Sequence, residues 1–137
     1  MGVWSFVKGA GAKLFGGGEP EPEALVKEVE ELGLDASGLD ITVEGDKVKV
    51  AGEAVSQEMK EKIIVAVGNV EGVAAVEDDV AGDDPVFHTV EKGDSLWKIA
   101  EATLGNGARY PEIFEANKPM LSDPDKIYPG QVLRIPT

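Results

Sequence analysis

The sequence predicts an α+β protein made of two small domains, with an N-terminal segment docked on the first. Between residues 19 and 81 the apolar patterns have the order helix, strand, strand, helix, strand. From residue 86 onward the order is strand, helix, helix, strand, and the short polar stretch GDDP separates the two patterns. With 137 residues and 42% hydrophobic content, the chain can form a packed core in each domain. We therefore expect an N-terminal segment at 1–18, a first domain at 19–81, a linker at 82–85 and a second domain at 86–137.

The first domain is expected to begin with a helix and a β-hairpin. In EALVKEVEELGL the apolar residues have helical spacing, and Gly33 ends the run. The stretches LDITVEG and DKVKVAG alternate apolar and polar residues on either side of a turn at Gly45–Asp46. This pattern predicts a hairpin with one buried face, made by Ile41, Val43, Val48 and Val50.

A second helix is predicted over SQEMKEKIIVAVG. Ser56 can cap its N-terminus, and Glu58 suits the positive end of the helix dipole. The apolar stripe of this helix consists of Met59, Ile63, Ala66 and Val67. We expect the helix to stop at Gly68–Asn69 and a third strand to include Val73 and Val76.

The stretch AVGNVEGVAAV, residues 66–76, allows two interpretations. Gly68 and Gly72 permit backbone conformations with φ > 0, in which the chain can turn and direct several carbonyls one way. The carbonyls at a helix C-terminus are unpaired and carry partial negative charge. The stretch is thus either a glycine-capped helix leading into a strand or a cation seat built from main-chain oxygens.

The second domain is predicted from three segments. FHTVEKGDSLWKIAEATLG indicates a strand, a turn at Gly93, a cap at Asp94 or Ser95, and a helix. RYPEIFEANK indicates a second helix. Pro129–Gly130 suits a type II turn, and QVLRIP then forms the closing strand.

Composition narrows the possible functions. Acidic residues outnumber basic ones 26 to 13, and the net charge of −13 repels phosphate backbones and anionic lipid while attracting cations. We therefore expect no nucleic-acid partner. The chain has no cysteine and a single histidine, His88, which we place on the wet face of a strand; a catalytic triad or a His-rich metal site is not expected. Hydrolase, Walker, zincin and dinucleotide motifs are absent, so we expect a monomeric binding protein and not an enzyme.

The N-terminal segment MGVWSFVKGAGAKLFGGG has neither a signal-peptide pattern nor a transmembrane span, so we expect a cytoplasmic protein. Its mixture of apolar residues and lysines is similar to a short interfacial helix. Because it is short and interrupted by glycines, we favour docking on the protein's own surface over membrane attachment, and we expect no stable membrane insertion.

Two domain families are recognisable in these patterns. Residues 86–137 resemble a LysM domain through the Val90 strand, GDSL at 93–96, Ile99–Ala100, Asn117–Lys118, Ile127, Pro129–Gly130 and the closing Leu133, Ile135 and Pro136. Residues 21–81 resemble a BON domain, and the matching residues are Val48, Val50, Gly52 and Gly72–Val73.

The whole chain resembles the bacterial cytoplasmic potassium-binding proteins of BON-LysM architecture. The resemblance is carried by GxxxFVKxAGxKL near the N-terminus, SQExKEKIxVAVGN, IFEANKPML and DKIYPGQVLRIP. It implies that potassium is held by main-chain carbonyls and that rubidium or caesium can substitute. It further implies a potassium sensor in which the ion draws the two domains together. The implied ligands are Val7, Lys8, Ala10, Gly68, Val70 and Val73.

Two other functions remain open at this point. LysM modules in general bind N-acetylglucosamine polymers, here in a groove between 93–96 and 117–121, where Trp97, Tyr110 and Tyr128 could stack on sugar rings. The second open function is that of a membrane-associated BON protein. The acidic clusters at 77–79 and 83–84 lack the EF-hand spacing, so we do not expect a specific calcium site.

Overall fold

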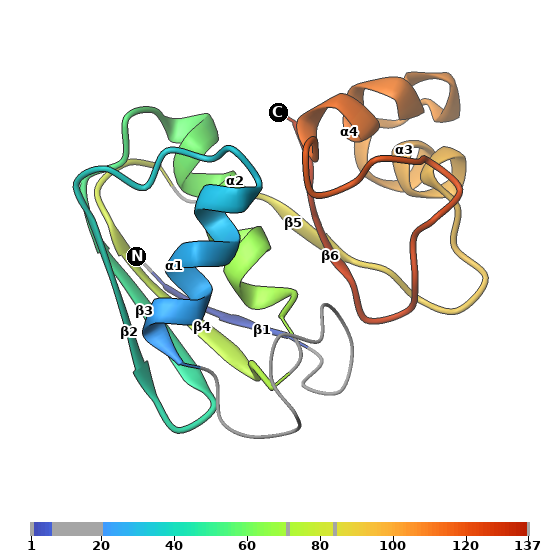
Figure 1. The fold of residues 1–137 in the computed structure, drawn as a ribbon. Helices are drawn as coiled ribbons and strands as arrows, with labels where there is room; N and C mark the ends of the chain where they lie inside the picture. The colour runs from blue at the N-terminus through green and yellow to red at the C-terminus, as the bar shows by residue number, and fades with distance from the viewer. Residues whose placement is uncertain (1, 7–20, 71, 84, 137) are drawn as a thin grey trace.

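The computed structural model describes residues 2–6, 21–70, 72–83 and 85–136, and its two domains lie side by side (Figure 1). The first contains strands and two helices, and the second contains a short sheet with two helices and a 3-10 turn. The elements are β1 (Gly2–Ser5), α1 (Pro22–Glu31), β2 (Leu39–Glu44), β3 (Lys47–Gly52), α2 (Gln57–Gly68), β4 (Ala75–Val80), β5 (Phe87–Thr89), α3 (Leu96–Leu104), η1 (Gly107–Arg109), α4 (Tyr110–Ala116) and β6 (Val132–Arg134).

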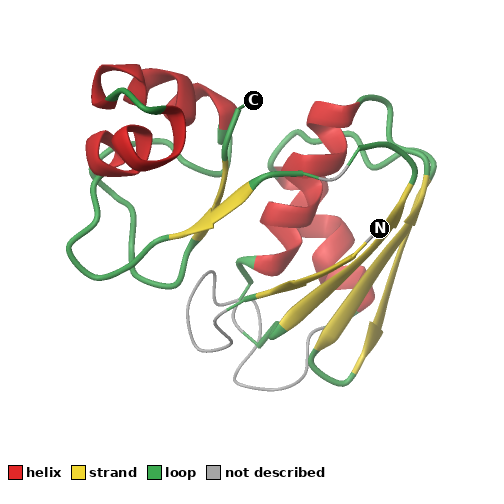
Figure 2. Ribbon diagram, turned by 180° about the vertical axis from the view of Figure 1, so that it is seen from behind, coloured by secondary structure: helices red, strands yellow, loops and turns green. Residues whose placement is uncertain are grey.

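The first domain is a four-stranded sheet with the strand order β1-β4-β3-β2, covered on one face by α1 and α2 (Figure 2). β2 and β3 form the predicted hairpin, in which Ile41 pairs with Val50 and Val43 with Val48. β4 runs parallel to β3, and α2 makes the connection between them. The alternation of apolar and polar residues therefore predicted both the pairing and the buried face.

Both helices of the first domain begin and end where the sequence indicates. The Met59 N–H donates to the Ser56 hydroxyl at 3.0 Å, which confirms Ser56 as the cap of α2. After α1 the chain turns at Gly33, whose φ of 78° favours glycine. Val73, however, precedes β4, which begins only at Ala75.

The first residues of the chain correct one expectation. Gly2–Ser5 is a strand and not an interfacial helix, and it pairs antiparallel with β4 so that Trp4 lies opposite Val76. Phe6 follows with 8% exposure, and its N–H donates to the Ala74 carbonyl at 2.9 Å. These contacts confirm that residues 2–6 dock on the first domain. The segment is ordered there because β4 supplies hydrogen-bonding partners that a free four-residue segment lacks.

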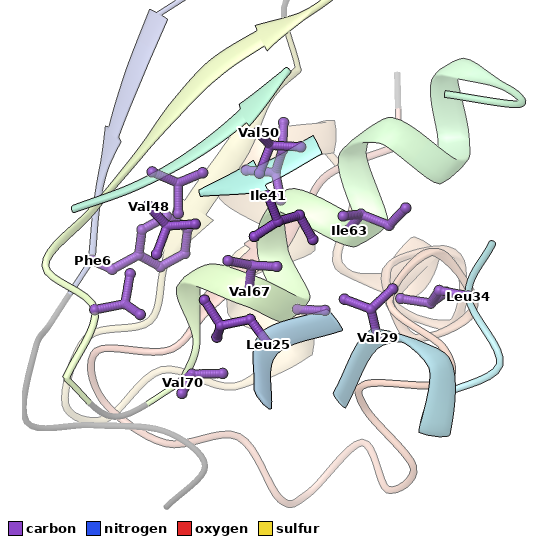
Figure 3. Packing of buried hydrophobic residues seen from close by; sticks show 14 of the residues in the cluster. Phe6, Leu25, Val29, Leu34, Ile41, Val48, Val50, Ile63, Val67 and Val70 are labelled. Atoms are coloured by element: carbon purple, nitrogen blue, oxygen red, sulfur yellow. The ribbon is translucent and has the colours of Figure 1, made fainter. Parts of the chain in front are cut away.

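The core of the first domain lies between the sheet and its two helices. Figure 3 shows Phe6 and Val70 among its side chains, together with Leu25, Val48 and Val67. The core therefore includes both the docked N-terminal residue Phe6 and the start of the loop after α2, at Val70.

One ion pair is buried beside this core. Lys60 of α2 lies 3.5 Å from Asp78 of β4, and both side chains have 0% exposure. Lys60 Nζ also donates to the carbonyl of Asp83 at 2.8 Å, so this lysine ties the linker to the first domain.

In the second domain, α3, η1 and α4 pack beside the antiparallel pair β5–β6. The Lys98 N–H donates to the Ser95 hydroxyl, so Ser95 and not Asp94 caps α3. Gly130 has a φ of 91°, as the turn before β6 requires. The core consists of Val90, Leu96, Ile99, Ala100, Ile113, Leu121, Leu133 and Ile135.

The two domains are in direct contact. The rings of Trp4 in β1 and Phe87 in β5 meet edge to face with centroids 4.7 Å apart. Val132 of β6 is 2% exposed and belongs to the core cluster of the first domain. The second domain is thus packed against the first through apolar contacts as well as through the polar contacts described below.

Candidate functional site

The loop between α2 and β4 is the candidate site, and it turns as soon as the helix ends. Asn69 is the C-cap of α2, with φ −82° and ψ 14°, and its N–H donates to the Val65 carbonyl. The Val73 N–H then donates to the Val70 carbonyl at 3.2 Å. Gly72 has a φ of 99°, which confirms the prediction of a left-handed conformation at this glycine.

Gly68 does not adopt the left-handed conformation that we predicted for it. Gly68 is the last residue of α2 and has no positive φ. A Cβ at this position would lie 2.0 Å from the Cζ atom of Phe6. Glycine is therefore required because the Phe6 ring lies directly against the end of the helix, a contact that no local sequence pattern predicts.

The carbonyls expected to bind the ion lie in a buried stretch of chain. Val70 and Val73 are 1% and 0% exposed, and Gly68 is buried as well. Among the described residues, no backbone N–H of a loop or turn donates to the carbonyl oxygen of Gly68 or Val73. The Val70 carbonyl accepts one bond, and a carbonyl oxygen has two lone pairs. The described half of the expected ligand set is therefore chemically able to accept a cation.

The other expected ligands, Val7, Lys8 and Ala10, lie outside the described residues. The last described residue of the N-terminal segment, Phe6, lies at the loop through its ring contact with Gly68 and its hydrogen bond to Ala74. The structure thus brings the end of β1 and the C-terminus of α2 together, two segments far apart in the sequence.

Acidic side chains do not assemble into an alternative metal centre in the described part of the chain. Glu77 lies 3.8 Å from Lys47 and Asp79 lies 3.2 Å from Lys49, both pairs on the outer face of the sheet. Within residues 2–6, 21–70, 72–83 and 85–136, no group of three or more His, Cys, Asp or Glu side chains could hold a metal ion.

Asn69 makes a contact between the two domains that sequence reasoning missed. Its side-chain Nδ2 donates to the Val132 carbonyl at 2.8 Å, and its Oδ1 accepts from the Val132 N–H at 2.9 Å. The partner lies 63 residues away, so the sequence shows only an asparagine suited to a helix end. These two bonds tie the loop to β6 of the second domain.

A separate hollow of about 440 Å³ lies on the second domain. Trp97 and Tyr110 line it and are 49% and 39% exposed. One wall, residues 94–97, agrees with the predicted groove. The other lining residues are Pro124, Asp125 and Ile127, and none comes from 117–121.

Two further side chains in the second domain differ from expectation. Tyr128 does not line this hollow, and burial raises the pKa of its hydroxyl. His88 is half-buried and hydrogen-bonded to Asp94 at 3.1 Å, so it is not simply a wet-face residue. The Glu91 N–H and His88 both donate to the Asp94 carboxylate, and these bonds lower its pKa.

Comparison with known proteins identifies both domains. The model of the BON domain matches residues 23–82, and the model of the LysM domain matches residues 88–136. The potassium binding protein Kbp of Escherichia coli O6:H1 is 48% identical over 147 residues, covering 99% of each chain. An uncharacterized protein of Deinococcus radiodurans is 39% identical over 65% of this chain and 29% of its own length. SpoIVD-associated factor A of Bacillus subtilis is 46% identical over 37% of this chain and 12% of its own.

No helix in the described ranges is both long enough and apolar enough to cross a bilayer.

Proposed function

The chain belongs to the family of the potassium binding protein Kbp, and from this membership we propose that it binds potassium selectively through main-chain carbonyl oxygens. The near full-length identity of 48% carries the proposal, because it spans the N-terminal segment, both domains and the loop after α2. The proposed ligands are the carbonyls of Val7, Lys8, Ala10, Gly68, Val70 and Val73.

The chemistry of the loop supports a large monovalent ion. Neutral carbonyl dipoles can replace the weak hydration shell of potassium, whereas small or divalent ions lose too much on dehydration. Rubidium and caesium should therefore substitute for potassium, and sodium and magnesium should bind poorly. The left-handed Gly72 and the end of α2 at Gly68–Asn69 provide the turn in the backbone that such a site needs.

The proposal includes a closed state favoured by the ion. Ligands from the N-terminal segment and from the loop converge only when β1 is docked, so potassium should shift the population towards the docked form. The contact of Trp4 with Phe87 and the bonds of Asn69 to Val132 support this idea, because both connect the neighbourhood of the loop to the second domain. We infer a compact monomeric sensor in the cytoplasm; cell fractionation tests the location.

Calorimetric titration of metal-free protein with KCl and with NaCl tests the proposal directly. We expect saturable binding of one potassium ion and no comparable heat with sodium at equal ionic strength. Equal heats for the two salts would refute potassium selectivity.

A second candidate function rests on the hollow of the LysM domain. Its exposed Trp97 and Tyr110 could stack on the sugar rings of an N-acetylglucosamine polymer. Part of the Trp97 ring already packs on Gly107, where an added Cβ would lie 2.3 Å from the ring. Retention of the protein on insoluble peptidoglycan, and its loss in Trp97→Ala, would support glycan binding independently of potassium.

A further inference from the structure

The outer edge of β6 is covered by two asparagine side chains. The Gln131 carbonyl accepts from the Val90 N–H, and the Ile135 N–H donates to the Val86 carbonyl. The alternate residues Val132 and Arg134 therefore direct their N–H and C=O groups away from β5. Asn117 donates to the Arg134 carbonyl at 2.9 Å and accepts from its N–H at 2.7 Å. Asn69 makes the same pair of bonds with Val132.

A carboxamide can do this because its donor and acceptor lie side by side like those of a peptide group. The two asparagines therefore replace the neighbouring strand that this edge lacks. Asn117 comes from the LysM domain itself, whereas Asn69 comes from the BON domain. The second half of the edge is thus completed by the partner domain.

Asn69 also lies inside the candidate ion-binding loop. It follows Gly68 and precedes Val70, whose carbonyls are both proposed ligands. Its main chain is bonded to Val65 of α2 and its side chain to Val132 of β6, so the start of the loop is held between these two elements.

We propose that Asn69 is a positioning residue that makes the LysM strand β6 part of the scaffold of the ion site. This inference rests on the proposed function. By thermodynamic linkage, a loop ordered by potassium strengthens docking of the LysM domain, and docking strengthens potassium binding by the same factor. Asn69 carries this coupling without its side chain touching the ion.

The chain offers a matched control on the same helix. Glu61, about two turns before Asn69, forms an ion pair with Arg134 at 2.7 Å. This pair also joins α2 to β6, but it lies away from the loop. Glu61→Gln weakens docking while leaving the loop's own hydrogen bonds in place.

Potassium titration of four proteins tests the proposal: wild type, Asn69→Ala, Glu61→Gln and the double variant. Alanine suits the φ of −82° at position 69 and retains every proposed carbonyl. We expect the potassium Kd to rise about tenfold in Asn69→Ala. In Glu61→Gln it should rise at most about threefold, because the amide oxygen can still accept from Arg134 Nε. The double variant should bind no more weakly than Asn69→Ala, because the domains are then already uncoupled from the loop.

Asn69→Asp provides a second variant of unchanged size. It keeps an acceptor for the Val132 N–H but places a carboxylate oxygen against the Val132 carbonyl. Its added negative charge would tighten cation binding if only the local field mattered, whereas loss of the bond to β6 should weaken binding.

The outcomes separate the inference from the function on which it rests. If wild type binds potassium selectively and Asn69→Ala binds it equally well, the inference is wrong and the function stands. Tighter binding by Asn69→Asp, or fully additive effects in the double variant, would overturn it as well. A wild-type chain without preference for potassium would overturn the proposed function and this inference together.

Discussion

Replacement of Gly68 by alanine tests the contact between the N-terminal segment and the end of α2. A Cβ at this position would lie 2.0, 2.1 and 2.4 Å from three atoms of the Phe6 ring. Carbon atoms in contact are normally about 3.5 Å apart, so the ring must move by about 1.5 Å or leave its site. The helical conformation at Gly68 itself tolerates alanine, which isolates the steric effect.

The expected change in the free energy of unfolding follows from two opposing terms. Alanine in place of glycine stabilises a helix by about 0.5–1 kcal/mol, whereas expelling a buried phenylalanine loses about 1.5–3 kcal/mol. Phe6 is only 8% exposed, so most of its apolar surface would become exposed if the ring left its site. We therefore expect Gly68→Ala to destabilise the protein by about 0.5–2.5 kcal/mol.

Urea denaturation measures this effect, and Phe6→Ala supplies the control. Once the ring is absent, Gly68→Ala should become neutral or stabilising, so the double-mutant cycle should show strong coupling. A Gly68→Ala protein as stable as wild type, or additive effects of the two substitutions, would refute the argument. The same variant should also bind potassium more weakly, because Phe6 anchors the segment that contains Val7, Lys8 and Ala10.

Three further predictions follow from the site and the core. Lys8→Ala removes an ammonium group but no carbonyl, so the potassium affinity measured by calorimetry should change by no more than a few-fold. Gly72→Val, in contrast, forces a branched residue into a left-handed conformation and should weaken potassium binding by about 1–3 kcal/mol. The opposite ranking of these two variants would exclude carbonyl coordination. Deletion of residues 2–12 should abolish high-affinity binding, and unchanged calorimetric affinity would place the site elsewhere. Lys60→Met leaves the buried Asp78 without its ion-pair partner, so the free energy of unfolding measured in urea should fall by about 3 kcal/mol. Adding Asp78→Asn should restore part of this stability. A Lys60→Met protein as stable as wild type would show that water reaches the pair.

Much of the fold could be predicted from the sequence, because its signals are local. The pairing of Ile41 with Val50 follows from two-residue periodicity around a glycine turn. Ser56 caps α2 because its hydroxyl and the nearby N–H groups are set by a few residues alone. The left-handed Gly72 is predictable for the same reason.

The features that could not be predicted depend on partners distant in the sequence. β1 is too short to show a periodic pattern, and its partner β4 lies far away in the sequence. The requirement for glycine at position 68 comes from the ring of Phe6. Likewise, nothing near Asn69 indicates that its amide completes the edge of β6.

The position of β1 at the border of the sheet has a consequence for solubility. Without β1, the residues of β4 from Ala75 to Asp78 would present a row of unpaired main-chain groups, which is a template for pairing with another chain. The charged side chains of β4, among them Glu77 and Asp79, would then oppose self-association together with the net charge of −13. With β1 in place, the edge of the sheet is a strand of only four residues, and very short edge strands are poor templates for pairing. Forms of the protein that lack β1 should therefore be more prone to aggregate than the intact chain.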